Sequence, residues 1–509
     1  MMKASRFALL LLVGLVALGL AAGACDDDGD DGHDDGASDD DNDDDDNDTA
    51  VGDDDDDDTP FECAVDNQVA IVGLLYCRTG AHEGYSLFSP LFGFKTYLID
   101  MYGRVVNQWR TNHTPGNSEY LLTDGTLLRT GAVVQPYFVA GGAGGVVQRL
   151  DWDGNLLWEF EYASPEHVLH HDIEMLPNGN ILMIAFEHKS AAEAIAAGRD
   201  PDLLADDELW IDHLIEVRPS GARSGDIVWE WHIWDHLVQD FDPTKAHYGV
   251  VADHPERIDV NYINEAPIAD WTHLNTVTYH VELDQIMLSS REFSEVWIID
   301  HGTTTEEAAG HTGGRYGRGG DLLYRWGNPA AYRIPDAEQT FYGQHDTHWI
   351  ADGLSGAGHA LAFNNGDLRA PVEFSSIDEW ILPLQADGSY EYFPGVGYGP
   401  DAPVWSYAAP NPGDFFAPRL SGVQRLPGGN TLICDGTNGE FFEVTPAGQI
   451  VWRYVNPITP LGAVNPDGWI PETPDGRANA VFRVRRFDPD YPGLAGRDLT
   501  PGDTIEGGR

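Results

Sequence analysis

Residues 147–158 read VQRLDWDGNLLW, which is an apolar strand, a turn with Asp and Gly, an apolar pair and a tryptophan. The same phrase returns as YLIDMYGRVVNQW at residues 97–109 and as FEVTPAGQIVW at residues 442–452. Looser copies with longer turns occupy residues 214–229, 296–326 and 380–405. Six hairpins that each end in Trp, with further short strands between them, predict an all-β fold. We therefore expect residues 61–509 to form a six-bladed β-propeller of four-stranded blades, in which the tryptophans pack blade against blade.

Closure of the ring and two insertions complete this prediction. We expect residues 68–72 to pair with residues 481–484, because such pairing hides sheet edges. Residues 189–206 contain the Ala-rich run AAEAIAA and are predicted to be helical, whereas residues 232–269 form a long connection. Long loops in a compact fold are usually functional, so both insertions are expected to wall the mouth of a central channel.

The N-terminus has the features of an export signal. Residues 1–24 start with basic side chains and continue with an apolar run, residues 7–20, that is short for a membrane span. Ala22 and Ala24 suit ordinary signal cleavage, whereas Cys25 directly after small residues suits lipoprotein processing, with Cys25 as the lipid acceptor. We favour the second alternative and predict an exported protein, a periplasmic or cell-surface lipoprotein whose only link to the membrane is this lipid.

An acidic tract follows the signal. Residues 26–58 contain 21 Asp among Gly, Asn and Ser, within a chain of net charge −55. Such a tract cannot bury apolar surface, so residues 25–60 are predicted to be a disordered, self-repelling tether. Calcium binding is the alternative, but no regular loop with a closing Glu is present. The acidity of the whole chain argues against a nucleic acid partner, which would need clustered Lys and Arg.

The cysteines are few. Cys63 and Cys77 are close in sequence and would be exported, so they are expected to form a disulfide, which leaves Cys434 unpaired and buried. Neither a CxxC pair nor an HExxH motif is present to indicate zinc, and we expect no metal site.

One polar position recurs in the repeat. His345 and His171 are each followed by Asp, and the glycine of a turn comes eight residues after each histidine. Asn117 and Ser421 stand at the same spacing before their glycines, and His273 opens a similar unit with a later turn. Repeats stacked around an axis would bring these positions together, so three histidines are expected to meet in the channel.

Neighbouring histidines were weighed against these three. His348 lies three residues after His345 and is ranked second as a nucleophile, whereas His170 should face the opposite side of its strand from His171. Three histidines could instead bind a metal ion, but the cation of Arg291 nearby would oppose that.

Four segments, taken in chain order, resemble a known family. They are His170-His171-Asp172 with LPNGNIL at 176–182, DWTHLN at 270–275 with Ser289-Ser290-Arg291, Gln344-His345-Asp346, and QRLPGGNTL at 424–432. Together they are similar to the arylsulfate sulfotransferases, the exported bacterial type that needs no nucleotide sulfate donor. The resemblance extends over residues 84–484.

The resemblance implies a six-bladed propeller that moves a sulfuryl group from an aryl sulfate to a phenol through a sulfohistidine, without a cofactor. It implies that His345 is the nucleophile and that His171, His273 and Arg291 hold the sulfate, while Glu292 stands where the family often has His. We add His170, Asn275 and His348 as substrate-binding candidates.

Elementary chemistry supports these roles. A neutral imidazole is a competent nucleophile near pH 7 because its ordinary pKa is about 6.5. The guanidinium of Arg291 is a permanent cation whose fork matches sulfate oxygens. Either His171 or His273 could protonate the leaving phenolate and later deprotonate the incoming phenol. The alternatives are a quinoprotein-like propeller oxidoreductase and a surface propeller that only binds a partner.

Overall fold

The protein is described here by a computed structural model that covers residues 61–67, 69–263, 266–334, 337–474 and 476–507. These residues belong to one unit, Phe61–Arg509. The predicted signal, the lipid acceptor Cys25 and the acidic tether lie outside the described residues, so those expectations stay predictions. Within the described residues, no helix is both long and apolar enough to cross a membrane.

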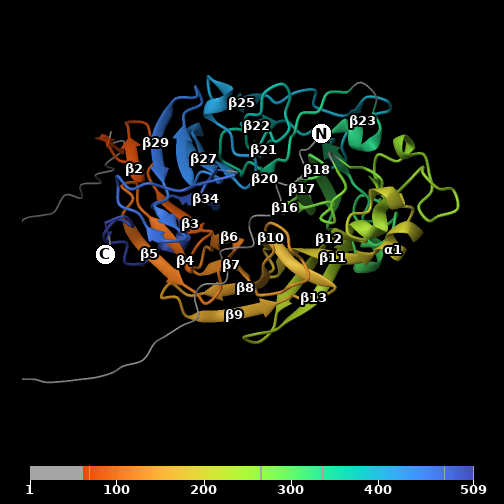
Figure 1. Cartoon of the computed structure of the whole chain (residues 1–509), viewed down its shortest axis with the longest axis horizontal. Coiled ribbons are helices and arrows are strands. Elements are labelled where there is room, and N and C mark those ends of the chain that lie inside the picture. Colours follow the sequence, from red (N-terminus) through yellow and green to blue (C-terminus); the bar gives the residue numbers. More distant parts are fainter. Residues whose placement is uncertain (1–60, 68, 264–265, 335–336, 475, 508–509) are drawn as a thin grey trace, which may run out of the picture. The chain divides into compact units, whose positions relative to one another are not determined.

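Six antiparallel sheets stand around a central axis, as predicted, and form a six-bladed β-propeller (Figure 1). The first blade is built of β34 (Val481–Phe487), β3 (Tyr85–Pro90), β4 (Lys95–Ile99) and β5 (Val105–Arg110). The second is built of β6 (Pro115–Leu121), β7 (Leu127–Ala132), β8 (Gly145–Leu150) and β9 (Leu156–Glu161). The third is built of β10 (His167–Met175), β11 (Ile181–Ser190), β12 (Glu208–Pro219) and β13 (Gly225–His232).

The other three blades follow in chain order. The fourth contains β16 (Leu274–His280), β17 (Gln285–Ser290), β18 (Glu295–Asp300) and β19 (Tyr324–Trp326). The fifth contains β20 (His345–Trp349), β21 (Ala360–Asn364), β22 (Ser376–Trp380) and β25 (Trp405–Tyr407). The sixth contains β26 (Gly422–Arg425), β27 (Thr431–Asp435), β28 (Glu440–Val444) and β29 (Ile450–Val455), and is extended by β2 (Gly73–Cys77) and β1 (Val65–Asp66).

Minor elements lie in the connections. Four two-stranded ribbons are β14 (Leu237–Val238) with β15 (Ile258–Asp259), β23 (Tyr392–Phe393) with β24 (Gly397–Tyr398), β30 (Ile458–Thr459) with β31 (Gly462–Ala463), and β32 (Glu472–Thr473) with β33 (Gly476–Arg477). The α-helices are α1 (Ala191–Ala196) and α2 (Thr305–Ala308). The 3₁₀ turns are Pro201–Leu203, Ile233–His236, Val251–Asp253, Pro329–Tyr332, Pro412–Asp414, Pro427–Gly429 and Pro492–Leu494.

The repeated tryptophans join successive blades, which explains the sequence repeat. Each lies on the fourth strand of its four-stranded blade, counted from the axis, and its indole N–H donates to a turn of the next blade at 2.8–3.3 Å. The six donors, in chain order, are Trp109, Trp158, Trp229, Trp326, Trp405 and Trp452. Because Trp452 donates to the carbonyl of Met101 in the first blade, the circle of hydrogen bonds is closed. The predicted role in packing blade against blade is confirmed.

The predicted pairing that closes the ring is wrong in its strands. β34 pairs with β3 and becomes the innermost strand of the first blade, while β2 pairs with β29 at the outer edge of the sixth. In this position Arg483 and Arg485 of β34 form ion pairs with the buried carboxylates of Asp172 and Asp346 from the third and fifth blades, which stabilises β34 as an inner strand. The N-terminal strands then cover the edge that β29 would otherwise expose.

A disulfide holds these N-terminal strands together. It joins Cys63 to Cys77, the pair that the sequence suggested, with a Cα–Cα distance of 5.3 Å. Cys434, on β27, is free and buried.

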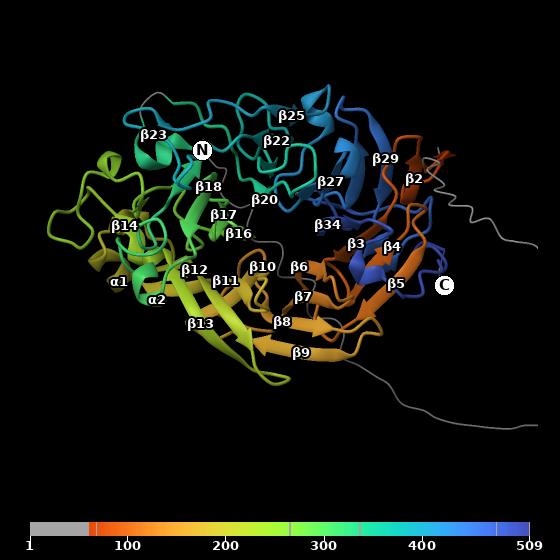
Figure 2. The same ribbon diagram turned by 180° about the vertical axis from the view of Figure 1, so that it is seen from behind.

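The two insertions pack beside the third and fourth blades, where Figure 2 shows α1, α2 and β14 gathered. The Ala-rich run is helical, as predicted, and α1 has a capping box made by Ser190 and Glu193. The second insertion returns to the propeller where the backbone N–H of Trp210 donates to the backbone carbonyl of Ala269 at 2.6 Å. This contact fixes the segment that leads directly into His273.

Candidate active site

Left-handed residues mark the repeated polar position. Asn117, His171, His273 and Ser421 have φ angles of 107°, 51°, 47° and 86°, and in the fifth blade Asp346, one residue after His345, has φ 56°. The strand register shifts beside His171, between Leu169 and Ile173. Such conformations are costly for residues other than glycine, and they persist where the surroundings enforce them. Asn117, His171 and Asp346 lie within the inner strands β6, β10 and β20, where they interrupt the alternation of side chains.

The four predicted catalytic residues converge. The rings of His171 and His273 lie with centroids 4.6 Å apart, although they come from different blades. The ring of Phe482 on β34 lies 5.8 Å from that of His171 and 6.3 Å from that of His345. The backbone N–H of Arg291 donates to the backbone carbonyl of His273 at 3.1 Å, and the charges of Arg291 and His273 both act on His345. All of these side chains are largely buried.

His345 is fixed in one tautomer. Its Nδ1 faces two acceptors, the carbonyl of Gly343 at 3.1 Å and Oδ1 of Asn365 at 2.8 Å. The amide nitrogen of Asn365 donates to the carbonyls of Ala417 and Leu420, which orients its oxygen toward His345. Nδ1 must therefore carry the hydrogen, and the lone pair remains on Nε2.

Burial also keeps this imidazole neutral. It lowers the pKa of His345 to about 3, and the cation of Arg291 acts in the same direction. At neutral pH the side chain is thus an uncharged imidazole with one lone pair available on Nε2.

His273 is in the opposite electrostatic state. Its Nδ1 lies 2.6 Å from the carboxylate of Asp270, which accepts the hydrogen. Burial would lower the pKa of His273, but the charge and the hydrogen bond of Asp270 outweigh it, so the pKa is raised. Two histidines whose environments move their pKa values apart have the character of a base or nucleophile and of an acid. His273 is the member of this pair whose protonated form is favoured.

His170 and His171 contact each other, so the prediction that they face opposite sides of the strand is wrong. The left-handed conformation of His171 brings the two Nδ1 atoms to 2.8 Å. Nε2 of His170 lies 2.8 Å from the carboxylate of Asp212, and its ring stacks on that of Phe186. Burial, followed by the neighbouring His273 and His170, holds the pKa of His171 well below its ordinary value. His170 therefore supports His171 from behind.

Arg291 is buried between two carboxylates. It forms an ion pair with Glu292 and another with Asp367, whose oxygen lies 2.8 Å from Nη2. Burial acts to lower the pKa of Arg291, but Glu292 and Asp367 outweigh it and raise the pKa. Arg291 is therefore held as a permanent cation beside the histidines, with its charge shared between two carboxylates.

Two further candidates have contacts of their own. The amide of Asn275 donates to the carbonyl of Gln344 at 2.8 Å, so it positions the residue before His345. Nδ1 of His348 lies 2.9 Å from the carbonyl of Asp346, and burial lowers the pKa of His348. The contacts of His348 lead toward Asp346 and Arg485 and away from the three converging histidines.

Sequence reasoning missed the partners of these groups. Asp270, Asn365 and Asp367 lie in loops, and only Asp270 gives a signal, because it stands three residues before His273 in DWTHLN. The repeated Asp after each histidine has a structural role, since Asp172 and Asp346 accept N–H bonds from Val277 and Val423 of the following blades.

No curated protein matches the chain. Among solved structures, a protein of unknown function from Bacteroides caccae has 12% identity and a TM-score of 0.41, and covers 80% of this chain and 99% of its own. A β-propeller domain of Cps50 (Swd1) from Myceliophteria thermophila has 11% identity and a TM-score of 0.37, with coverage of 75% and 89%. A streptogramin B lyase has 10% identity and a TM-score of 0.36, with coverage of 84% and 96%.

A family model decides the assignment. The model described as arylsulfotransferase (ASST) matches residues 92–456, which include all four converging residues. The family implies aryl sulfates and phenols as substrates. The match therefore favours aryl sulfotransferase activity over the quinoprotein and surface-binding alternatives. The chain belongs to the arylsulfotransferase (ASST) family.

Proposed function

We propose that the protein transfers a sulfuryl group from an aryl sulfate to a phenol by a ping-pong mechanism through a sulfohistidine at His345, without a nucleotide sulfate donor. The observation that carries the proposal is the state of His345, a neutral imidazole whose Nδ1 donates to Gly343 and Asn365 and whose Nε2 has a free lone pair.

The first half-reaction breaks the ester. Nε2 of His345 attacks sulfur, an N–S bond forms, and the S–O bond to the aryl group breaks with its electron pair moving to the phenolate oxygen. His273 supplies the proton to that oxygen from its Nε2, because its Nδ1 hydrogen is held by Asp270. Arg291 offsets the negative charge on the sulfuryl oxygens, as donors do in phosphoryl transfer.

The second half-reaction reverses these steps on another phenol. His273, now neutral, takes the proton from the incoming hydroxyl, and that oxygen attacks sulfur as the N–S bond breaks. The electron pair returns to Nε2 of His345, so the enzyme regains its starting state. One acid–base residue thus serves both halves, as microscopic reversibility requires.

A transfer assay tests the proposal. Full-length protein would be incubated with 4-nitrophenyl sulfate, with and without phenol, beside His345→Ala and a control, His359→Ala. His359 lies just before β21 in the same blade, bonded to Glu379 at 2.7 Å and away from the site. We expect phenol-dependent release of nitrophenol that is lost in His345→Ala and kept in His359→Ala. Sustained release without phenol would contradict transfer and point to a sulfatase.

We also propose that the protein is exported and held at the membrane by a lipid on Cys25, as a periplasmic or cell-surface lipoprotein. The support is the order of a basic start, an apolar run and small residues immediately before Cys25. Labelling of cells with a radioactive fatty acid should mark the wild type and not Cys25→Ser. Equal labelling of both proteins, or of neither, would reject the lipid anchor.

A further inference from the structure

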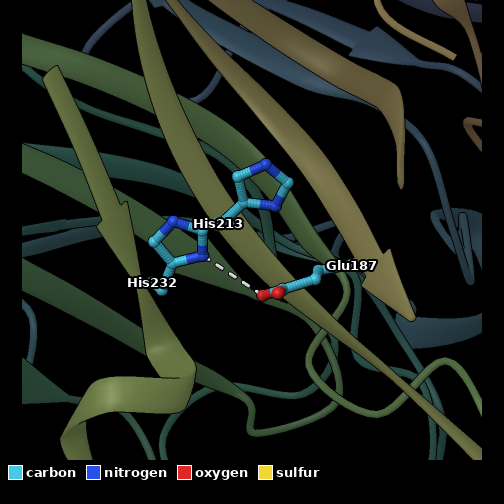
Figure 3. A group of neighbouring side chains, drawn as sticks. All are labelled: Glu187, His213 and His232. Carbon is cyan, nitrogen blue, oxygen red and sulfur yellow. Dashed lines mark hydrogen bonds and ion pairs between the residues drawn. The ribbon is translucent and has the colours of Figure 1, made fainter. Parts of the chain in front are cut away.

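Two histidines and a carboxylate meet on the third blade, outside the active site (Figure 3). They are Glu187 on β11, His213 on β12 and His232 on β13, and one nitrogen or oxygen atom of each lies within 4.8 Å of the others. Nδ1 of His232 lies 3.1 Å from Oε2 of Glu187. The two imidazoles are parallel, with an interplanar angle of 1° and centroids 4.9 Å apart. We call these three residues the blade-3 cluster.

Strand register brings the cluster together. His213 and His232 are direct partners on neighbouring strands, and Ala185 is the partner of His213 on the other side. Glu187 is two residues after Ala185, so it points to the same face of the sheet. Asp212, which holds His170 for the active site, points to the opposite face. The cluster is therefore rigidly positioned and separate from the catalytic residues.

One ligand atom of the cluster has no partner. His213 is 2% exposed, its Nε2 lies 3.3 Å from the hydroxyl of Tyr162, and its Nδ1 is buried without a hydrogen bond among the described residues. Figure 3 shows that the unpartnered nitrogen of His213 is turned toward the carboxylate of Glu187. When Nε2 of His213 donates to the hydroxyl of Tyr162, the lone pair on its Nδ1 faces the carboxylate of Glu187. Two acceptors then face each other. A bound cation between them would satisfy both.

The surroundings are compatible with a cation. Glu230 and Asp235 add negative charge around His232. Lys189 is the nearby positive charge, and it binds Oε1 of Glu187 and lies over the ring of Trp234, which leaves Oε2 on the side of the histidines. Carboxylates that bind metals commonly keep such an outer hydrogen bond.

A second cluster in the chain provides the contrast. His236, His311 and Asp321 also lie within reach of a common ion. Nδ1 of His236 faces Asp321 and its Nε2 faces the carbonyl of Ala308, both at 2.8 Å. Both nitrogens of His236 thus already have partners within the protein, and neither is left unpartnered as Nδ1 of His213 is. This cluster is already satisfied by its own contacts.

We propose that the blade-3 cluster binds a divalent transition-metal ion with the ligand preferences of zinc, through Nδ1 of His213, Nδ1 of His232 and Oε2 of Glu187. Two histidines and one carboxylate are a common zinc set, with the fourth position left to water. Tetrahedral zinc bonds of about 2.0–2.1 Å place neighbouring ligand atoms roughly 3.3 Å apart. The 3.1 Å between His232 and Glu187 is close to that separation.

The proposal departs from the expectation of no metal site. That expectation rested on motifs in which ligands are close in sequence, whereas these three come from three strands that only the blade brings together.

Metal binding tests the proposal directly. Full-length protein, first treated with a chelator, would be titrated with ZnCl₂ by calorimetry and with CoCl₂ by visible absorbance. Because the Asp-rich tract can also attract cations, each variant is compared with the wild type. The variants are His213→Ala, Glu187→Gln and the control His311→Ala from the satisfied cluster.

The expected result is one tight site in the wild type and in His311→Ala, with the absorbance of four-coordinate Co²⁺. His213→Ala and Glu187→Gln should bind about 100-fold more weakly or worse, since even outer-shell changes cost 10–100-fold. The temperature of thermal unfolding should rise with ZnCl₂ in the wild type and in His311→Ala, but not in the other two variants. Glu187→Gln keeps the shape of the side chain, and sulfotransferase activity in all four proteins checks that each is folded. Equal affinity in all four proteins, or no tight site in the wild type, would overturn the proposal.

Discussion

Asp270→Asn is the change that most sharply separates the roles of the histidines. Asp270 accepts from Nδ1 of His273 at 2.6 Å, and it is the group that raises the pKa of His273 against the effect of burial. An asparagine of the same shape removes the charge. Hydrogen bonds to charged groups contribute about 1.5–3 kcal/mol, and each 1.4 kcal/mol is a factor of ten. We expect kcat/KM to fall about 10–100-fold for an aryl sulfate whose leaving phenol is weakly acidic.

The pH dependence of kcat/KM should also change in Asp270→Asn, in a direction that the role of His273 determines. The protonated form of His273 is needed in the first half-reaction, so kcat/KM decreases as pH rises through its pKa. Since the pKa of His273 is raised by Asp270, the alkaline decrease should begin at a lower pH in Asp270→Asn.

Two substrates make the assay specific. The phenolate that leaves 4-nitrophenyl sulfate needs little protonation, so this substrate should lose much less than phenyl sulfate in Asp270→Asn. An equal loss for both substrates with an unchanged alkaline limb would refute the assignment of His273 as the acid.

Three further predictions follow from buried contacts. Arg483→Met leaves the carboxylates of Asp172 and Asp346 buried without this partner, and should lower the free energy of unfolding by about 3–5 kcal/mol in denaturant titrations; a loss below about 1 kcal/mol would contradict it. Trp452→Phe removes the donor to Met101 that closes the ring and should cost about 0.5–1.5 kcal/mol, whereas Trp469→Phe, at a position 73% exposed, should cost almost nothing. Asn365→Asp places a carboxylate at Nδ1 of His345, raises its pKa from about 3, and should move the acidic decrease of kcat/KM to higher pH; a profile like that of the wild type would argue against the assigned tautomer.

The fold was predictable because each copy of its repeat lies within a short, continuous stretch of sequence. The Trp at the end of each hairpin donates to the next blade, so one local phrase encodes both the strand pair and the contact between blades. The strands that close the ring were not predictable in this way. Their pairing brings Arg483 and Arg485 to carboxylates of the third and fifth blades that lie more than 130 residues away in the sequence, and no local pattern reports such contacts.

The site was predictable to the level of which residues meet, but not of how they are held. The spacing to the turn glycine placed His171 and His345 at one position of the repeat, and the left-handed residues show why that position is special. The register shift beside His171 breaks the alternation of side chains on which the prediction for His170 relied. Asn365 and Asp367 come from the loop after β21, where no periodic sequence pattern indicates which side chains reach the site.

Direct detection of the sulfated enzyme tests the central claim. Full-length protein would be mixed with 4-nitrophenyl sulfate without an acceptor, stopped under alkaline conditions, and digested for mass spectrometry. The account predicts the mass of one SO₃ group on the peptide that contains His345, and its disappearance when phenol is added before the reaction is stopped. Phenol-dependent transfer without any modified His345 peptide, or a modification on another residue such as His348, would contradict it.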